Sequence, residues 1–540
     1  MPYSLLQTTD AEALLGGDHH APPANMPAID GIRPDLIISD EAHNIKNIDS
    51  AARAQRLQRY IRAYQPAVVA LSGTITSKSI RDYYHLISAA LHELCPLPLS
   101  NALANNWSYV LDPEKPTDMR AGAGSKTGPL SPLVDWARKN FPEEEIPSGV
   151  PGFRKAYKLR LTSTPGVVAT GDAEIGVSIT MENTPVPKHT QHPDWPKLDE
   201  LMDQVENLWL TPSGDEIEHG FHKWRYLYEL TSGFYYRLRW PTTEELEAKG
   251  LSKEEAHIYL EMAKAHHEKH QEFSSSLRKW IEYKGRPGLD TPLLVRTSMA
   301  NHGPKEVGRP LYTLWREMKD MEFDGMPERI SEPVRVCSYK IDHAVEWARK
   351  VQKRKKPALI WYKHHESGKW LAEALREAGV DAIWCPSNST MKGTNEIVRL
   401  AGEGKGPHKD KILVVSMGGH GTGKNLQHNF EEQHFLDFPR QPDLLEQVLG
   451  RTHRNGQKAD ELHPSTCNTN DFDHQNMFAC LIESLYIHQT TGTRQKAIYA
   501  TYNPMPKRFP TDFLRERGFT DLPQLDREAQ TRLAEKFGEM

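Results

Sequence analysis

The sequence predicts an α/β protein in which two zones of parallel sheet flank a mostly helical middle zone. Short apolar runs alternate with helical patterns in residues 1–97 and again in residues 335–505. Strands that alternate with helices in this way form parallel sheets. Residues 98–334 instead carry long helical patterns rich in Pro, Trp and charge, and the polar residues 506–540 are expected to form a C-terminal tail.

Composition excludes several classes of protein. The 540 residues carry a net charge of -5, so any nucleic-acid contact must come from local basic patches. No apolar run approaches the roughly 18 residues that a membrane-spanning helix needs, and residues 1–4 lack the pattern of a signal peptide. Five scattered cysteines without a CxxC pair favour a reducing, intracellular and cytoplasmic location, and they argue against a disulfide scaffold or a cysteine zinc site.

The first zone places carboxylates at a strand end. An apolar run at 36–38 is followed by Asp40, Glu41 and, after one alanine, His43. The first carboxylate suits Mg²⁺ and the second can polarise a water that attacks a phosphate. A solvated turn is the alternative. A second strand at 67–71 ends in Ser72-Gly73-Thr74, which could relay between two sites or be an ordinary turn. A helix is expected from residue 80.

The middle zone offers candidates for binding nucleic acid. Residues 221–240 hold eight aromatic side chains together with basic ones, and we single out Arg237, Arg239 and Trp240. Such residues can stack on unpaired bases and hold phosphates, or they can form a helical core with arginines reaching to solvent. Residues 121–128 suggest a flexible loop and residues 253–284 a long helix. His266 and His270 have a metal-binding spacing but no evident third ligand.

The second zone contains predicted buried strands at 358–362 and 412–416, with a helix at 369–378 between them. A glycine-rich run at 418–425 nearly fits the phosphate-binding P-loop, but Asn425 stands where that motif needs Ser or Thr for Mg²⁺. Further on, Arg451 and Arg454 are expected on one face of a helix. Guanidinium groups there could neutralise phosphate charge, or the helix could simply be a basic surface.

Taken in order, the motifs DEAHNIKN, LSGT, GGHGTGKNLQ and QVLGRTHRNGQ resemble those of superfamily 2 helicases, most closely the Swi/Snf-type DNA translocase branch and the compact helicases of bacteriophages. The resemblance covers residues 40–97 and 357–457. It implies two RecA-like domains, the first incomplete at its N-terminus, and a mostly helical insertion between them. It also implies a DNA-dependent ATPase that uses ATP and Mg²⁺ and binds DNA.

The resemblance also assigns roles to single residues. It implies that Asp40 holds Mg²⁺, that Glu41 is the general base and that Gln447, Arg451 and Arg454 act in the cleft between the domains, with Arg454 as the arginine finger. The remaining residues would couple hydrolysis to DNA or contact DNA backbone and nucleotide. The coupling residues would be His43, Ser72, Gly73 and Thr74, and the contact residues Gly421, Thr422, Gly423 and Asn425.

One departure from the family pattern changes the expectation. Members carry a P-loop before the DEAH strand, whereas the 39 residues before Asp40 contain none. A separate upstream polypeptide, a misassigned start or a degenerate fragment would each explain this. We therefore expect weak ATP binding by the chain alone, with Lys424 as the first substitute ligand. The alternatives to a DNA translocase or helicase are a non-catalytic DNA-binding subunit, a fragment of a split helicase and, with least support, a metal-dependent nuclease.

Overall fold

The computed structural model describes residues 34–46, 48, 52–73, 75–76, 79–98, 100–112, 130–168, 176–184, 192–217, 220–290, 292–323, 326–387, 389–493 and 495–503. Thr74, the expected loop at 121–128 and the expected tail at 506–540 lie outside this part of the chain. Within it, none of the helices has the length and apolar character needed to cross a membrane. All five cysteines are free thiols.

A seven-stranded sheet forms the largest unit, and each strand pair in it is parallel. The strand order is β11-β3-β10-β9-β6-β8-β7. The strands are β3 (Ser178–Thr184), β6 (Ala358–Tyr362), β7 (Ala382–Cys385), β8 (Ile412–Ser416), β9 (Glu432–Phe435), β10 (Glu461–Cys467) and β11 (Thr501–Asn503). β6 and β8 are almost wholly buried and coincide with the two predicted strands. The predicted α/β class is confirmed.

Helices cover both faces of this sheet, which explains why its central strands are apolar on both sides. One face packs on α14 (Tyr339–Lys353) and α15 (His365–Glu377). The helix predicted at 369–378 is α15, which begins four residues earlier. The opposite face packs on α16 (Thr394–Gly402), α18 (Pro442–Leu449), α19 (Asp471–Thr491) and α20 (Lys496–Tyr499). We call this unit, including β3, the second lobe.

β3 comes from the zone that we expected to be helical. Its side chains alternate between the core and the polar side, with Ile179 and Met181 buried, and this period of two is the signature of a strand. It joins the sheet between β10 and β11. The sheet is therefore built from two separate stretches of sequence, 178–184 and 358–503.

The N-terminal lobe contains a two-stranded parallel sheet of β1 (Leu36–Ser39) and β2 (Ala67–Ala70). Around it lie the 3-10 turns η2 (Ala42–Ile45), η3 (Ile80–Asp82) and η4 (His92–Leu94) and the helices α2 (Ala52–Tyr64), α3 (Tyr84–Leu91), α4 (Asn101–Leu111), α6 (Ser131–Asn140) and α7 (Val150–Ser163). The helix expected from residue 80 thus starts as a 3-10 turn, and its α-helical part begins at Tyr84.

One face of the β1–β2 sheet is apolar and open to solvent. The exposed fractions are 49% for Leu36, 60% for Ile38, 41% for Val69 and 48% for Leu71. The alternate side chains of the same strands, such as Ile37, face the core of the lobe. Parallel sheets are normally covered on both faces, so this sheet has an unusual apolar surface.

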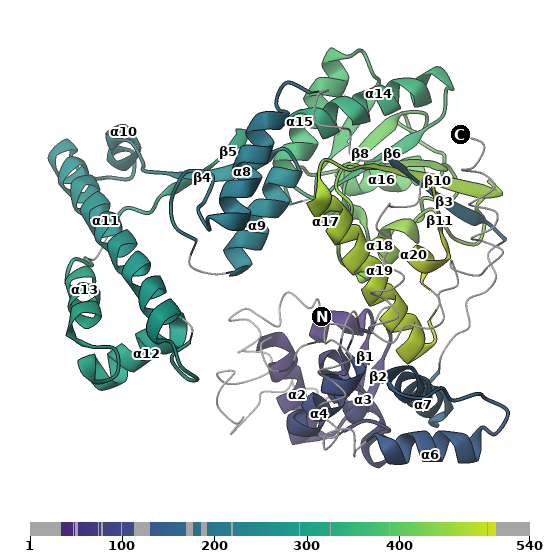
Figure 1. Cartoon of the computed structure of the whole chain (residues 1–540). Coiled ribbons are helices and arrows are strands. Elements are labelled where there is room, and N and C mark those ends of the chain that lie inside the picture. The colour runs from purple at the N-terminus through teal and green to yellow at the C-terminus, as the bar shows by residue number, and fades with distance from the viewer. Residues whose placement is uncertain are drawn as a thin grey trace.

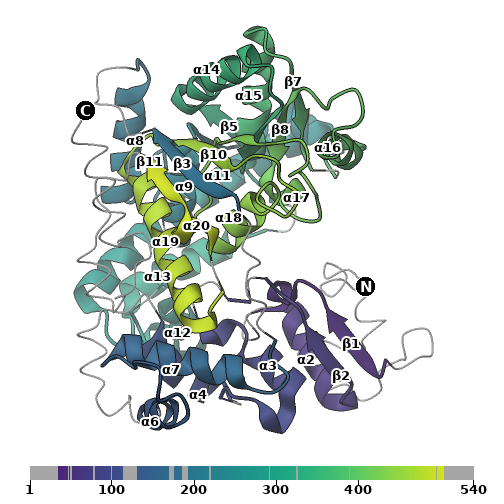
Figure 2. The ribbon, with the colours of Figure 1, turned by 90° about the vertical axis from the view of Figure 1, so that its right-hand side faces the viewer.

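α19 ties the two lobes together. Its first half packs on the large sheet, and Ile482, Leu485 and Tyr486 in its second half join the core of the N-terminal lobe. Figures 1 and 2 both show this helix running from one lobe to the other beside α7. Arg154 of α7 is fully buried and donates to Gln489 Oε1 on α19 at 3.1 Å.

A third unit projects from the second lobe through a two-stranded antiparallel ribbon of β4 (Phe234–Arg239) and β5 (Ile330–Arg335) (Figure 1). We call residues 240–329 the helical module. It contains α10 (Thr243–Glu247), α11 (Lys253–Lys284), α12 (Pro292–His302), η5 (Gly303–Lys305) and α13 (Arg309–Asp320). α8 (Trp195–Asn207) and α9 (Gly220–Thr231) pack at the base of the ribbon. α11 has the bounds that were predicted for the long helix.

Candidate active site between the two lobes

The DEAH turn follows β1 and is held by main-chain bonds. The amide of Ala42 donates to the carbonyl of Leu71 at 2.8 Å, which joins the ends of β1 and β2. Glu41 adopts a left-handed backbone with φ 51°, a conformation that costs energy for a residue other than glycine. Its amide donates to Asp40 Oδ1 at 3.0 Å. The turn therefore presents two adjacent carboxylates at the end of the strand.

His43 connects three groups that the sequence predicted to work together. Its Nδ1 lies 3.3 Å from Ser72 Oγ and 3.3 Å from Glu41 Oε2, and its Nε2 lies 3.3 Å from Nε2 of Gln447. Because an amide nitrogen only donates, Nε2 of His43 accepts and the neutral ring carries its proton on Nδ1. His43 thus links the end of β2 and the general-base candidate in one lobe to α18 in the other.

A second contact between the lobes was not predicted. Lys46, three residues after His43, forms an ion pair with Asp443 at 3.2 Å. Asp443 lies four residues before Gln447 on α18, so both side chains lie on the same face of that helix. His43 and Lys46 have i, i+3 spacing in one lobe, and Asp443 and Gln447 have i, i+4 spacing in the other. These matching spacings are a signal that could have revealed this contact.

The structure corrects the helix predicted for the arginine motif. α18 ends at Leu449, and Arg451 and Arg454 lie in the turns that follow Gly450. The helix stops because glycine favours helix poorly, and because the carbonyl of Arg451 instead accepts from the amide of Leu426, 3.1 Å away, in the glycine-rich loop. This bond fastens the two motifs to each other.

Both arginines contact the glycine-rich loop. Arg451 donates to the carbonyls of Gln447 at 3.0 Å and Lys424 at 3.1 Å, and Arg454 donates to Asn425 Oδ1 at 2.9 Å. Burial and the charge of Arg454 lower the pKa of Arg451 to about 10, and the carboxylate of Glu41 opposes that shift from the other lobe. Arg451 is thus a buried cation with an incomplete set of counter-charges, which is a favourable setting for an anionic ligand.

The P-loop alternative for residues 418–425 does not fit the observed geometry. A P-loop needs a helix whose N-terminus follows the glycines. Here the short α17 (Met417–His420) contains the first two glycines and ends before the others, and the residues after Lys424 run through a turn into β9. The ammonium of Lys424 donates to the carbonyl of Asn395 on α16, 3.4 Å away. Lys424 therefore contacts α16 with its side chain and the arginine motif only with its backbone.

The glycines of this loop have separate roles. A Cβ on Gly421 would lie 2.4 Å from the carbonyl oxygen of Met417, so no larger residue fits there. Gly423 has φ 67°, which favours glycine. Thr422 and Asn425 are exposed, and Asn425 contacts Arg454. In the N-terminal lobe, Ser72 reaches His43, as described above, and Gly73 is exposed.

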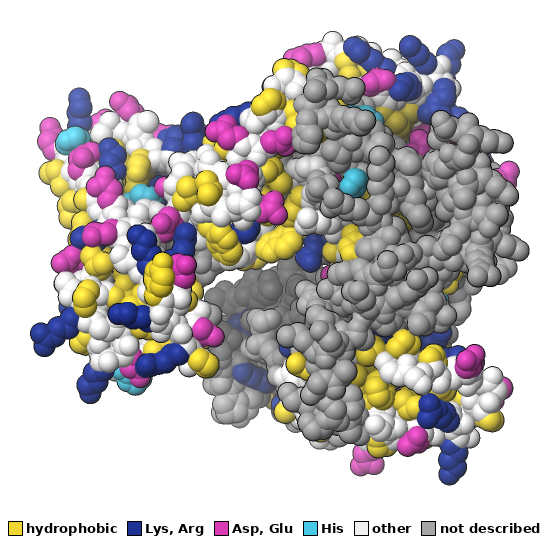
Figure 3. All heavy atoms as spheres, in the orientation of Figure 1, with side chains coloured by type: hydrophobic (Ala, Val, Ile, Leu, Met, Phe, Trp, Pro, Cys, Tyr) yellow, Lys and Arg dark blue, Asp and Glu magenta, His cyan; other side chains and the backbone are white. Residues whose placement is uncertain are grey.

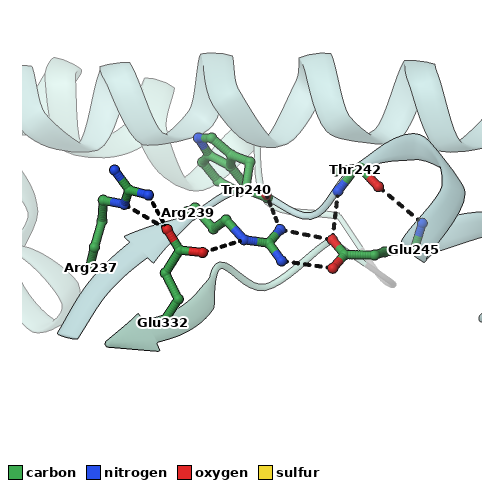
Figure 4. Close-up of polar contacts among 6 residues, drawn as sticks. All are labelled: Arg237, Arg239, Trp240, Thr242, Glu245 and Glu332. Carbon is green, nitrogen blue, oxygen red and sulfur yellow. Dashed lines mark hydrogen bonds and ion pairs between the residues drawn. The ribbon is translucent and has the colours of Figure 1, made fainter. Parts of the chain in front are cut away.

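The basic candidates of the middle zone lie away from this site and form ion pairs (Figure 4). Arg237 pairs with Glu332 on the neighbouring strand, and Arg239 pairs with both Glu332 and Glu245. The hydrogen bond from Arg239 lowers the pKa of Glu245 to about 2. Trp240 is half-buried in the module, with Arg329 over its ring. These contacts fasten α10 to the ribbon and favour the structural interpretation of the two arginines.

The rest of the aromatic stretch divides between core and surface. Tyr226, Phe234 and Tyr235 are buried, whereas Phe221 and Trp224 are exposed. On the face of the helical module shown in Figure 3, basic and acidic side chains are interspersed. His266 and His270 lie with ring centroids 6.4 Å apart, and within the described ranges no third metal ligand accompanies them.

Comparison with known proteins gives weak likenesses. No protein-family model and no curated protein matches the chain. Among solved structures, T4 UvsW is 18% identical over 24% of this chain and 25% of its own, with a TM-score of 0.21. The C-terminal part of the Fun30 ATPase domain is 14% identical over 55% of this chain and 89% of its own, with a TM-score of 0.29.

A third solved structure, S. cerevisiae Dbp5 bound to RNA and ADP BeF3, is 14% identical over 36% of this chain and 42% of its own, with a TM-score of 0.24. The chain thus spans about a quarter of UvsW and less than half of Dbp5. All three TM-scores are below 0.5.

Proposed function

We propose that this chain is the motor part of a DNA-dependent ATPase that acts as a DNA translocase or helicase, with its two lobes as RecA-like domains. A single observation carries the proposal: the DEAH turn and the arginine motif, about 400 residues apart in sequence, meet across the lobes through His43 and Gln447. The motifs that resemble superfamily 2 helicases therefore come together as a cleft enzyme requires.

The proposed site contains the two kinds of group that phosphate transfer needs, namely carboxylates in one lobe and arginines in the other. An exposed carboxylate at a strand end fits a Mg²⁺ ion, because hard cations prefer oxygen ligands. Asp40 would hold this ion, which neutralises phosphate charge when it is bound with ATP. Glu41 would orient and deprotonate the attacking water. Arg451 and Arg454 would stabilise the charge that develops on the phosphate.

His43, which contacts groups in both lobes and is called the hub below, would couple ATP hydrolysis to DNA binding. A change at Glu41 on hydrolysis alters the partner of His43, and His43 in turn contacts Ser72 and Gln447. Ser72, with Gly73 and Thr74, would pass the change to DNA bound along the lobes. On the other lobe Gly421, Thr422, Gly423 and Asn425 would contact the DNA backbone and nucleotide, since Asn425 already touches Arg454.

The first experiment is ATP hydrolysis by the whole chain with and without double-stranded DNA. A Glu41→Gln variant removes the general base and keeps the shape of the side chain, and Glu244→Gln, on the helical module, is the matched control. DNA-stimulated turnover that Glu41→Gln abolishes and Glu244→Gln preserves is the expected result. Equal turnover in both variants would contradict the assignment of Glu41.

A second candidate function is a motor subunit that needs a separate polypeptide bearing a P-loop. The open apolar face of the β1–β2 sheet favours it, and so does the position of Lys424, whose side chain contacts α16. In that case the chain alone binds DNA and shows no turnover. Strong binding of Mg-ATP by the isolated chain would exclude this candidate. A nuclease would instead cut DNA with Mg²⁺ and without ATP.

A further inference from the structure

A cluster of metal-binding side chains lies at the base of the ribbon, away from the proposed active site. It consists of His192, Asp194 and Cys337, each of which offers one ligand atom within 4.8 Å of the others. His192 and Asp194 precede α8, and Cys337 lies between β5 and α14. No feature of the proposed ATPase uses these residues.

We propose that His192, Asp194 and Cys337 bind a zinc ion that fastens the start of α8 to the junction of β5 and α14. Cys337 Sγ lies 4.0 Å from His192 Nδ1, and Asp194 Oδ2 lies 3.7 Å from the same nitrogen. Tetrahedral zinc with its usual bond lengths separates a sulfur and a nitrogen ligand by about 3.6 Å and a nitrogen and an oxygen ligand by about 3.4 Å. Small side-chain rotations reach these values.

The imidazole of His192 already has the tautomer that a metal ligand needs. The amide of Asp194 donates to Nδ1 at 3.3 Å, so Nδ1 is the unprotonated nitrogen, and a zinc ion bound there would replace this hydrogen bond. Nε2 lies 3.3 Å from Asp342 Oδ2 and 3.3 Å from Ser338 Oγ. A histidine that binds zinc commonly donates its other ring N–H to a carboxylate, which fixes the tautomer and raises the basicity of the ligand. Asp342 has this outer position.

The chemistry of the three ligands selects zinc. A thiolate, an imidazole and a carboxylate are a ligand set typical of zinc, and hard cations such as Mg²⁺ take only oxygen. One thiolate and one carboxylate also balance the charge of a divalent ion. Cys337 is only 4% exposed, whereas Asp194 lies closer to the surface. A water from the solvent side can supply a fourth ligand.

The position of the cluster gives the ion a structural role. The amides of Val336 and Cys337 both donate to the carbonyl of Gly233, just before β4, so Cys337 lies where both strands of the ribbon enter the second lobe. A Cβ on Gly233 would lie 2.1 Å from the carbonyl oxygen of Cys337, which shows how closely the two backbones approach. A metal here would fix the base from which the helical module projects.

Cobalt titration of the whole chain, stripped of metal, tests this inference without any assay of ATP hydrolysis. We expect a thiolate-to-cobalt charge-transfer band and tetrahedral d–d bands that saturate at one equivalent and disappear on addition of zinc. Cys337→Ser should abolish the charge-transfer band, whereas the control Cys95→Ser, at a partly exposed cysteine, should keep it. Asp342→Asn should weaken metal binding about 10–100-fold, since it removes an outer partner of the ligand.

If hydrogen bonds alone hold these side chains together and no metal binds, the cobalt titration gives different results. Absence of a saturable band, or a band that persists in Cys337→Ser, would overturn the proposal. If Cys337→Ser does not fold, Asp194→Asn serves in its place, because its side chain is 40% exposed and asparagine keeps its shape. Unchanged cobalt affinity in Asp194→Asn and Asp342→Asn would likewise reject the site.

Discussion

Replacing Arg451 with glutamine should separate catalysis from stability. Arg451 is 6% exposed, and burial and the charge of Arg454 lower its pKa from the ordinary value of arginine to about 10. That difference disfavours the charged form by roughly 3 kcal/mol, at about 1.4 kcal/mol per pKa unit. The two bonds that Arg451 donates to carbonyls return a similar amount, at about 1.5 kcal/mol each. The opposing effects nearly cancel.

We therefore expect the free energy of unfolding of Arg451→Gln to stay within about 1 kcal/mol of the parent protein, as measured by urea titration. DNA-stimulated ATP hydrolysis should fall by about 10³-fold or more, because Arg451, like the neighbouring Arg454, would stabilise the charge that develops on the phosphate. Arg399→Gln is the matched control, since Arg399 is an exposed arginine on α16. A loss of stability above about 3 kcal/mol would mean that Arg451 is chiefly a structural residue.

The pH dependence gives an independent check. The folded pKa of Arg451 is below its unfolded value, so the penalty on stability is complete below about pH 10 and decreases as the pH rises from there toward the ordinary pKa of arginine. The parent protein should therefore gain stability relative to Arg451→Gln over the start of this alkaline range. A difference between the two proteins that stays constant with pH would refute the buried-cation argument.

Three further predictions concern other contacts. His43→Ala and Gln447→Ala should each slow DNA-stimulated hydrolysis, and their double-mutant cycle should show a coupling energy of about 0.5–3 kcal/mol; additive effects would reject the hub. Lys340→Met leaves Asp473, its partner at 3.0 Å, as an unpaired buried charge, so urea unfolding should show a loss of about 3–5 kcal/mol, and a loss below about 1 kcal/mol would contradict this. Arg239→Ala should change stability by less than about 1 kcal/mol because its ion pairs are partly exposed, and DNA affinity and its salt dependence should not change; a weaker, less salt-dependent affinity would restore the DNA-binding interpretation.

Sequence alone could locate elements whose signal is local. β6 and β8 are continuous apolar runs because both faces of their sheet are covered. The start of α11 is marked by a capping box, in which Ser252 and Glu255 satisfy each other's backbone amides. The carboxylates at the end of β1 were likewise visible from the order of residue types.

Contacts between distant segments were harder to predict. Arg239 looked like a base-stacking and phosphate-binding candidate because its partner Glu332 lies far along the chain. β3 was missed because an alternation over only five residues, 178–182, is a weak signal inside a polar, Pro-rich stretch. The arginine motif was assigned to a helix because its i, i+3 spacing suits one. The carbonyl of Arg451 instead accepts a hydrogen bond from the amide of Leu426, a residue of the glycine-rich motif, and sequence spacing gives no sign of this bond.

The antiparallel ribbon has a consequence for how this chain could change by evolution or design. Arg239 on β4 and Ile330 on β5 are cross-strand partners, so the chain leaves for the helical module and returns from it at one point. Adjacent ends of this kind tolerate domain insertion and removal. Residues 240–329 could be exchanged for a short hairpin turn without altering the order of strands in the large sheet. Besides the ribbon, the module contacts the rest of the chain at residues 215–217, so its size and shape can vary as long as a replacement leaves that short segment satisfied.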